Sequence, residues 1–390
     1  MLHSYYNESL LGLQGVEIKK IEKNEEKMVI EIELPRKTCV CPMCEKRTNK
    51  IHDYRIQKVK DLSAFGKPVV LILRKRRYTC SCGKCFAEPN EFLSKYQRMT
   101  RRTIFSMLER LSSVHSYTDT AIEYGVSPNT VIRHFKQIQY AKPTQLPEVI
   151  GIDEFRGNSS GEKFHVILTD IKEKRVIDIM RTRKEMNLCD YFKKYDRKNV
   201  KYFVSDMYKP YAEIAATYFP NAVYVIDKYH WIRQMTWAFE AVRKEVQKRF
   251  SKKYRIYFKH SKGLLLKHGE ELNGDERRQV YIMLDVSPSL STAYFLKEQL
   301  YRILKEPDAN KQKQMFYDWI REVEDSEVPA FQKCAATYRN WLIPITNSFF
   351  CTYTNGFTEG CNNKIKVLKR NAYGFRNFKT FRNRILFLFS

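Results

Sequence analysis

The spacing of apolar residues predicts strands early in the chain and helices after them. Apolar side chains alternate with polar ones, as in half-buried strands, at Val16, Ile18, Met28, Ile30, Ile32 and Leu34. A second pair of strands is predicted on either side of Gly66. From Thr100 to about Ile138 the spacing becomes helical, and one face carries Ile104, Met107, Leu108 and Leu111. We therefore expect a sheet followed by a helical segment.

The second pattern begins after a proline-containing linker at residues 141–147. Strand-like segments follow near residues 149–153, 163–170, 174–180, 200–206 and 222–226, and helices are expected near 186–195 and 209–218. This succession predicts an α/β layer fold. Residues 228 to about 345 have a mostly helical pattern, and helix resumes from about 356 to the end.

Composition indicates packed domains with a polyanionic partner. The chain has 390 residues, of which 43% are hydrophobic and 14% aromatic, enough for real cores. Its 70 Lys and Arg exceed its 44 Asp and Glu by 26, which favours nucleic acid as the partner over a generally basic soluble protein. No stretch of about 20 apolar residues exists, and residues 1–8 lack the pattern of a signal peptide, so we expect a cytoplasmic, nucleoid-associated protein.

Six of the ten cysteines fall in two short clusters, which in a reducing compartment indicates metal binding. They are Cys39, Cys41, Cys44, Cys80, Cys82 and Cys85. Four thiolates on two loops suit tetrahedral Zn²⁺ in a zinc ribbon. Cys41, Cys44 and Cys82 are the firmest ligands, and the fourth is Cys80 or Cys85. A reduced thiol cluster without metal is the alternative. The neighbouring Arg74, Arg76 and Arg77 are expected to touch DNA backbone.

Residues 117–135 fit a helix-turn-helix. Ala121 is small where two helices would cross, Gly125 allows the positive φ of the turn, and Ser127 with Pro128 would begin the second helix. With Val131 and Ile132 facing inward, the residues expected to reach a major groove are Asn129, Thr130, Arg133 and His134. An ordinary pair of antiparallel helices is the alternative.

Three acidic residues stand out in this basic chain. Asp153 and Asp206 each end an apolar run, and Glu359 begins a helical stretch. A carboxylate at the end of a buried strand is costly unless it is paired or binds a cation. Mg²⁺ takes such ligands from separate segments, and two ions can promote phosphodiester chemistry. Spacing alone is only weak support for a catalytic site, and the alternative is solvated carboxylates at strand ends and at a helix N-terminus.

A strongly basic stretch follows Glu359. Its cations are Lys364, Lys366, Lys369, Arg370, Arg376, Lys379, Arg382 and Arg384. Because they border the expected metal site, we interpret them as phosphate contacts rather than as a solvated face.

The local sequences around these acids resemble the ISL-three family of bacterial insertion-sequence transposases. The resemblance rests on residues 151–155, 205–211, 227–230, 355–366 and 370–378, found in this order. It implies an RNase H-like fold whose DDE triad of Asp153, Asp206 and Glu359 holds Mg²⁺ or Mn²⁺, cuts transposon ends and joins them to target DNA. It also favours Cys41, Cys44, Cys80 and Cys82 as the zinc ligands, with Cys39 and Cys85 as extra cysteines.

Two further residues, Asp227 and His230, form a D-x-x-H unit similar to one in related transposases. We expect them near the triad, where His230 contacts DNA or orients a carboxylate; a buried, hydrogen-bonded histidine is the alternative. Asp170 and Asp178 are interpreted as structural or solvated.

The complete prediction is a multidomain α+β protein that acts on DNA as a homodimer or larger assembly. Its parts are a zinc-ribbon domain at 1–97, a helix-turn-helix at 98–142, an α/β RNase H-like catalytic domain at 148–230 and 346–390, and an all-helical insertion at 231–345. The other functions consistent with these features are a non-catalytic DNA-binding regulator derived from a transposase and a structure-selective nuclease without strand transfer.

Overall fold

The computed structural model describes residues 12, 13 and 15–390, apart from the side chain of Tyr257, and divides into two compact units. The first unit extends to Gln139 and the second runs from Tyr140 to Ser390. The N-terminal residues 1–8, on which the argument about a signal peptide rests, lie outside the described residues.

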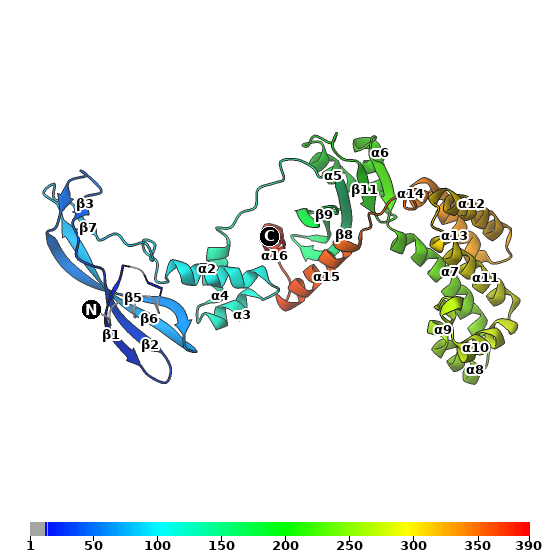
Figure 1. The fold of residues 1–390 in the computed structure, drawn as a ribbon, viewed down its shortest axis with the longest axis horizontal. Helices are drawn as coiled ribbons and strands as arrows, with labels where there is room; N and C mark the ends of the chain where they lie inside the picture. Colours follow the sequence, from blue (N-terminus) through cyan, green and yellow to red (C-terminus); the bar gives the residue numbers. More distant parts are fainter. Residues whose placement is uncertain (1–11, 14) are drawn as a thin grey trace. The chain divides into compact units, whose positions relative to one another are not determined.

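The first unit is built on an antiparallel hairpin of two long strands. Strand β6 pairs with β5 along one edge and with β2 and the short β7 along the other, and β1 pairs with β2, which gives the order β1-β2-β6-β5 with β7 on β6 (Figure 1). The strands are β1 (Glu17–Lys23), β2 (Met28–Glu33), β5 (Ile51–Ala64), β6 (Lys67–Thr79) and β7 (Cys85–Ala87). A separate two-stranded ladder joins β3 (Cys39–Val40) and β4 (Arg47–Thr48). Ile30, Leu71 and Leu73 are fully buried in the core beneath the sheet.

Helices close the first unit. They are α2 (Arg101–Glu109), the 3₁₀ turn η1 (Arg110–Ser112), α3 (Tyr117–Glu123) and α4 (Pro128–Phe135). Gly125 has φ +56°, as expected for the turn between α3 and α4. The Ser127 hydroxyl accepts a hydrogen bond from the backbone N–H of Thr130 at 3.3 Å, and Pro128 occupies the first turn of α4. The predicted local signals for the start of α4 are therefore present.

The second unit contains a mixed five-stranded sheet in the order β10-β9-β8-β11-β12. The first three strands along the chain pair antiparallel, and the last two run parallel to β8. The strands are β8 (Val149–Ser159), β9 (Glu162–Asp170), β10 (Arg175–Met180), β11 (Tyr202–Ser205) and β12 (Val223–Ile226). All five lie where the apolar runs predicted them, although β8 is longer than expected.

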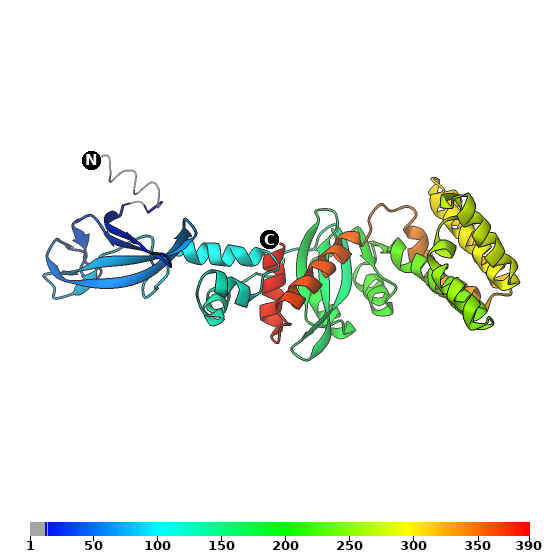
Figure 2. The ribbon, with the colours of Figure 1, turned by 90° about the horizontal axis from the view of Figure 1, so that it is seen from below.

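Helices cover both faces of this sheet. The side chains of Ile150 and Ile152 pack into a core with α5 (Glu185–Phe192) and α6 (Lys209–Tyr218). Because side chains alternate along a strand, Gly151 and Asp153 point to the opposite face. That face is crossed by α15 (Gly356–Asn371), which contacts β8 and β9, while α16 (Phe378–Leu388) contacts β10 (Figures 1 and 2).

Between β12 and α15 the chain forms an all-helical insertion around a core that includes Trp231, Phe316 and Tyr338. Its helices are α7 (Lys228–Lys248), α8 (Lys252–His260), α9 (Lys262–Leu266), α10 (Gly274–Asp285), α11 (Pro288–Lys305), α12 (Ala309–Asp325), α13 (Pro329–Asn340) and α14 (Leu342–Asn347), with a 3₁₀ turn η2 (Gly269–Glu271).

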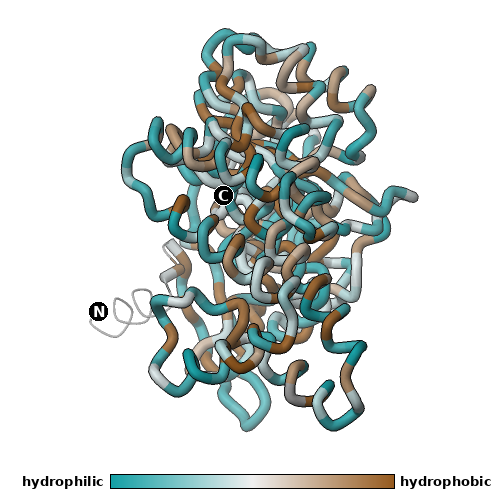
Figure 3. Tube along the Cα trace, turned by 90° about the vertical axis from the view of Figure 1, so that its right-hand side faces the viewer, coloured by the Kyte–Doolittle hydropathy of each residue, from teal (hydrophilic) through white to brown (hydrophobic). Residues whose placement is uncertain are grey.

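Hydrophobic and hydrophilic segments alternate closely along the chain (Figure 3). Within the described residues, no helix is long and apolar enough to cross a membrane.

Candidate active site and cysteine cluster

Four of the six clustered cysteines come together in the first unit. The sulfurs of Cys41, Cys44, Cys80 and Cys82 all lie within 4.8 Å of one another. Cys41 Sγ is 3.7 Å from Cys82 Sγ, and Cys44 Sγ is 3.5 Å from Cys80 Sγ. Four ligands at about 2.3 Å around a tetrahedral Zn²⁺ would be separated by about 3.8 Å, so the arrangement fits this ion.

Tight turns place these sulfurs. The backbone N–H of Cys41 donates to Lys46 O, and that of Cys80 donates to Lys84 O, both at 2.9 Å. Gly83 closes the second turn with φ +82°, a conformation that glycine adopts without strain. The backbone N–H of Cys82 lowers the pKa of Cys80, while hydrogen bonds with Cys82 and Cys80 raise the pKa of Cys44, so these close sulfurs do not all ionise readily without a cation.

The alternative fourth ligand lies elsewhere. Cys85 is on β7, where its sulfur is 3.7 Å from the hydroxyl of Thr79, and it is not part of the four-cysteine group. Cys39 is also outside the group, and burial raises its pKa. The cluster therefore supports a structural zinc bound by four cysteines.

Two of the predicted DNA contacts are buried, and those predictions are wrong. Arg76 is 7% exposed and forms ion pairs with Glu33 and Glu88, because its position on β6 faces inward. His134 is 3% exposed, and it packs inward beside Val131, one helical turn earlier. The prediction placed Ile132 inward instead, although that residue is only half-buried.

The other predicted contacts of this unit remain accessible. Asn129 and Arg133 are exposed on α4, and Thr130 is half-buried. Arg74 keeps about half of its side chain exposed while it pairs with Glu33, and Arg77 pairs with Asp53.

In the second unit, strand register brings Asp153 and Asp206 to the same level. Residues 202–204 of β11 pair with residues 149–151 of β8, so the residue numbers of paired positions differ by 53. The residue numbers of Asp206 and Asp153 also differ by 53, so these two acids have the same register. Parallel neighbours lie about 4.8 Å apart, which places the two acids side by side at the ends of adjacent strands.

Asp153 is 9% exposed and held by two hydrogen bonds. One oxygen accepts from the N–H of Glu154 at 2.7 Å, and the other accepts from the side-chain amide of Asn362 at 2.8 Å. Burial raises the pKa of Asp153 to about 7, and the charges of Asp206 and Glu359 act in the same direction. A carboxylate in this setting gains from a nearby cation.

Asp206 has an oxygen available to a cation. Its Oδ1 atom is buried, and within the described part of the chain it has no hydrogen-bond partner. Burial raises the pKa of Asp206, whereas His230 and Arg233 lower it through their charges. An orphaned buried carboxylate oxygen beside Asp153 is the feature expected where an ion binds.

Glu359 lies with the D-x-x-H unit. Its Oε1 atom is 3.1 Å from His230 Nε2, and ligand atoms of Asp227, His230 and Glu359 all lie within 4.8 Å of one another. Asp227 caps α7 by accepting from the N–H of Tyr229, and its second oxygen accepts from the N–H of Asn355 at 2.6 Å. Asp227 thereby ties the start of α7 to the start of α15, and this brings His230 to Glu359.

The three predicted triad carboxylates are neighbours, but they do not form one chelating group. Of the groups among the described residues whose ligand atoms lie within 4.8 Å, none joins Asp153, Asp206 and Glu359. Glu359 influences Asp153 through its charge while its nearest partner is His230.

Sequence reasoning missed residues that seat α15 against the sheet. Asn362, one turn after Glu359, contacts Asp153 and was assigned no role. The hydroxyls of Thr358 and Thr169 are hydrogen-bonded at 2.8 Å beside Gly151. A Cβ atom on Gly151 would lie 2.5 Å from the Thr169 hydroxyl and 2.8 Å from that of Thr358. Only glycine fits there, and the spacing of Thr358 and Asn362 at i and i+4 was the available signal.

A fourth carboxylate, Glu154, also lies at this site. Both of its oxygens accept from Arg183 at 2.7 Å, and its charge raises the pKa of Asp206. Arg183 in turn stacks over the rings of Phe164 and Tyr208.

Some cations of the basic C-terminal stretch are exposed, and others are buried. Lys364, Lys366, Arg370, Arg376 and Lys379 are exposed, and Lys369 is half-buried. In contrast, Arg382 pairs with Asp178 at 2.6 Å, and Arg384 is 1% exposed. Interpreting these two arginines as phosphate contacts was therefore wrong. The structural reading of Asp178 agrees with this pairing, and Asp170 is likewise buried and paired with Arg175.

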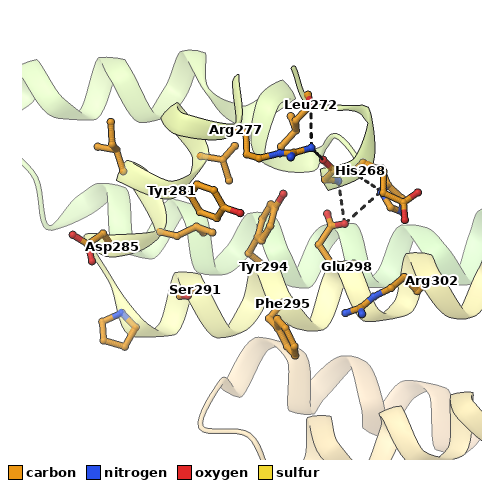
Figure 4. A pocket seen from close by; sticks show the side chains of 16 residues that line it. His268, Leu272, Arg277, Tyr281, Asp285, Ser291, Tyr294, Phe295, Glu298 and Arg302 are labelled. Carbon is orange, nitrogen blue, oxygen red and sulfur yellow. Dashed lines mark hydrogen bonds and ion pairs between the residues drawn. The ribbon is translucent and has the colours of Figure 1, made fainter. Parts of the chain in front are cut away.

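A hollow of about 1040 Å³ lies away from these residues, between α10 and α11 of the insertion (Figure 4). Glu298 accepts from the N–H of Gly269 at 3.0 Å and lies beside His268, while Arg277 reaches the carbonyl of Leu272. These polar groups brace the loop before α10. The hollow contains none of the residues predicted to bind metal or DNA.

Comparisons with known proteins match both halves of the chain. The family model described as "Transposase", of the DDE type of ISL3 elements, matches residues 150–385. The model of the "zinc-finger of transposase IS204/IS1001/IS1096/IS1165" matches residues 37–85.

Two of the individual relatives are named transposases, and a third has a different name. The transposase for insertion sequence element IS1001 of Bordetella parapertussis is 25% identical over 396 residues, which cover 98% of this chain and 97% of that protein. The transposase for IS1557 of Mycobacterium tuberculosis is 28% identical over 113 residues, 29% of this chain and 25% of that protein. A Lactococcus lactis protein named ATP-dependent protease is 36% identical over 104 residues, 27% of this chain and 32% of that protein.

Proposed function

Because the chain belongs to the ISL3 family of DDE transposases, we propose that it cuts the ends of an insertion sequence and joins them to new DNA. It would bind the terminal inverted repeats, hydrolyse a phosphodiester bond at each end, and direct the freed 3′-hydroxyls to target DNA. The observation that carries this proposal is the placement of Asp153 and Asp206 at one level of adjacent strands, with Glu359 approaching from α15.

The sheet supports an RNase H-like assignment for residues 148–230 and 346–390. Three antiparallel strands followed by two strands parallel to the first, with helices on both faces, give the order β10-β9-β8-β11-β12. In this arrangement residues 231–345 are an insertion between the second and third catalytic acids. The proposed domains of the first unit are a zinc ribbon at 1–97 and a helix-turn-helix at 98–142.

The residues present fit a divalent metal ion. Asp206 offers an unpartnered buried oxygen, and Asp153 has a raised pKa that a cation would offset. Mg²⁺ or Mn²⁺ bound there would neutralise charge at the scissile phosphate and promote ionisation of the attacking hydroxyl. Carboxylate ligands from separate segments are typical for these ions.

The protein's own groups would hold the reactants in place. Asn362 donates a hydrogen bond to Asp153, and His230 lies 3.1 Å from Glu359, so each acid has a side-chain neighbour that can help to position it. Exposed Lys364, Lys366 and Arg370 on α15 would contact phosphates, as would Arg376 in the following loop. Positioning of the scissile phosphate and neutralisation of its charge supply most of the catalysis in this chemistry.

DNA recognition is assigned to the first unit. Asn129, Thr130 and Arg133 on α4 would read base edges, while Arg74 and Arg77 lie on the sheet that carries the zinc ribbon. Because two element ends must be held together, we infer a homodimer or larger assembly that acts at the nucleoid.

The test is cleavage and joining by the full-length protein on a duplex that carries one element end. The wild type should nick the end in Mg²⁺ and yield joined products. Asp206→Asn should abolish both reactions and leave binding of the duplex nearly intact. Asp190→Asn, which changes an exposed acid on α5, is the matched control and should remain active.

Three other outcomes separate the alternatives. Binding without nicking by the wild type would identify a regulator. Nicking without joined products would identify a nuclease. Equal loss of binding and cleavage in Asp206→Asn would show that Asp206 is structural.

A further inference from the structure

Helix α7 carries a row of aromatic and basic side chains that begins beside Glu359, and all of them are exposed except the half-buried Arg233. We call this row the α7 stripe; it consists of Tyr229, Arg233, Trp237, Lys244 and Lys248. Steps of four or seven residues keep these side chains on one face of the helix. Tyr229 is 58% exposed and Trp237 is 53% exposed, whereas Trp231 on the same helix is fully buried in the insertion core.

The aromatic part of the stripe is ordered by Arg233. The guanidinium of Arg233 lies 5.4 Å from the ring centre of Tyr229 and 4.8 Å from that of Trp237. The same side chain approaches His230 at 3.5 Å, and its charge lowers the pKa of Asp206. The stripe therefore starts within the electrostatic reach of the carboxylate site.

The basic part of the stripe continues into α8. Lys244 and Lys248 are exposed, as are four cations of α8, namely Lys252, Lys253, Arg255 and Lys259. None of these six side chains has a salt bridge among the residues that the structure describes. The one acid of this segment, Glu245, pairs with Arg249 at 3.0 Å.

Charge within the insertion is strongly uneven. Residues 244–267 contain nine Lys and Arg against one Glu, whereas residues 270–325 contain eight Lys and Arg against twelve Asp and Glu. If the basic residues served only to keep the protein soluble, they would not need to be separated from the acidic residues in this way. Unpaired cations interleaved with exposed aromatic rings favour a nucleic-acid surface, since phosphates take the cations and sugars or bases pack on the rings.

We propose that the α7 stripe and α8 bind duplex DNA that continues outward from the carboxylate site, an inference that rests on the proposed function. From Tyr229 to Lys248 the helix is about 28 Å long at 1.5 Å per residue. This length corresponds to about eight base pairs at 3.4 Å per base pair. The insertion would thus bind the DNA that extends from one side of the cut position.

The test measures how binding depends on duplex length. Fluorescent duplexes carry the inverted repeat that borders the gene and are trimmed from either end in steps of about two base pairs. Binding of the full-length protein is followed by anisotropy without added Mg²⁺ and without chelator, so that DNA is not cut and zinc is retained. Wild-type affinity should rise until the duplex reaches about eight base pairs beyond the cut position on one side, and then level off.

Two variants locate the effect. Trp237→Ala with Lys248→Ala should bind the long duplex about tenfold more weakly and the short duplex as the wild type does. Lys244→Gln with Lys248→Gln changes only exposed lysines without salt bridges, so it tests the surface without altering the core. This second variant should reduce the slope of log affinity against log salt by about two. Tyr281→Ala with Arg278→Ala, an exposed aromatic and cation of α10, should behave as the wild type.

The proposal is overturned if wild-type affinity does not depend on this length, or if the Trp237→Ala/Lys248→Ala variant binds the long duplex normally. Equal loss in the α10 control would also overturn it. Failure of the proposed function is a separate result, because protein that follows the length rule but never cuts in Mg²⁺ lacks only the catalytic step.

Discussion

The two candidate metal sites of this protein differ in how closely their ligand groups lie. In the first unit, four sulfurs already lie at the spacing of a zinc tetrahedron. In the second, Asp153 and Asp206 share one level of the sheet while Glu359 rests against His230. The comparison teaches that the cysteine group is set by local turns, whereas the carboxylate group depends on the pairing of distant strands and on the packing of α15.

Their energetic consequences have opposite signs. The cysteine cluster gains stability from zinc, and it loses that contribution when a ligand is removed. The carboxylate site places acids in a setting that raises their pKa, so in the absence of metal it reduces stability at neutral pH. Perturbing each site should therefore move the stability of its unit in the opposite direction.

The largest effect is expected from Cys41→Ser. Loss of one sulfur removes most of a zinc-binding free energy of about 10 kcal/mol or more at neutral pH. Bound zinc should fall from about one ion per chain to none, and hydrogen exchange should accelerate in residues 39–48 and 79–87. Binding to element ends should weaken in parallel.

Cys85→Ser is the matched control for the cysteine cluster. Cys85 lies outside the four-cysteine group, so this variant should retain its zinc and its DNA binding. Loss of zinc from Cys85→Ser, or normal zinc in Cys41→Ser, would show that the ligand set is different.

The next effect is a gain of stability from Asp153→Asn. The pKa of Asp153 rises from 3.8 to about 7 in the folded protein, so the folded state holds this proton more tightly than the unfolded state. The contribution of Asp153 to the stability of the metal-free protein is therefore fully present below about pH 4 and is lost as the pH rises to about 7, a loss of at most about 4 kcal/mol. The variant should lose this pH dependence and unfold later than the wild type at pH near 8.

Unfolding experiments in denaturant, near pH 5 and pH 8, would measure this difference. Added Mn²⁺ should stabilise the wild type at the higher pH and leave Asp153→Asn nearly unchanged, because the variant lacks a charged ligand. A variant that is less stable than the wild type at the higher pH would mean that the buried carboxylate is compensated in another way.

A smaller effect is expected from Gly151→Ala. Its new methyl group would collide with the hydroxyls of Thr169 and Thr358, so α15 must move away from β8 at a cost of about 1–3 kcal/mol. Since α15 carries Glu359 and Asn362, cleavage should fall more than DNA binding. Thermal unfolding and single-turnover cleavage would report the two effects.

Gly360→Ala is the control on the same helix. A Cβ atom at Gly360 meets nothing within 4 Å, and alanine is favoured over glycine inside a helix by about 1 kcal/mol. This variant should be slightly more stable and fully active. If both glycine variants lost activity equally, the packing of α15 against β8 would not explain the loss of activity.

The same contrast explains what could be predicted from the sequence. The zinc ligands and the start of α4 depend on residues a few positions apart, so Cys41 with Cys44, and Ser127 with Pro128, were recognisable locally. The strands of the second unit were likewise visible in their apolar runs.

What could not be predicted depends on which face packs and on distant pairing. Arg76 and His134 were predicted to be surface residues because their side chains are basic or polar. The residue type alone does not show that a position on a strand or helix points inward. The contact of His230 with Glu359 joins segments 129 positions apart, and only the folded arrangement of α7 and α15 creates it. Asn362 was overlooked for the same reason.

The smallest expected effect tests whether Glu359 is held apart from the other acids. Since Glu359 lies 3.1 Å from His230, an ion that draws this carboxylate toward Asp153 must compete with the imidazole. His230→Ala removes that competition, and the Mg²⁺ concentration for half-maximal cleavage should fall about fivefold, equivalent to about 1 kcal/mol. His230→Gln, which retains a hydrogen-bond donor, should lie between the two proteins. A higher Mg²⁺ requirement in His230→Ala would instead mean that the histidine presents Glu359 to the ion and belongs to the carboxylate site.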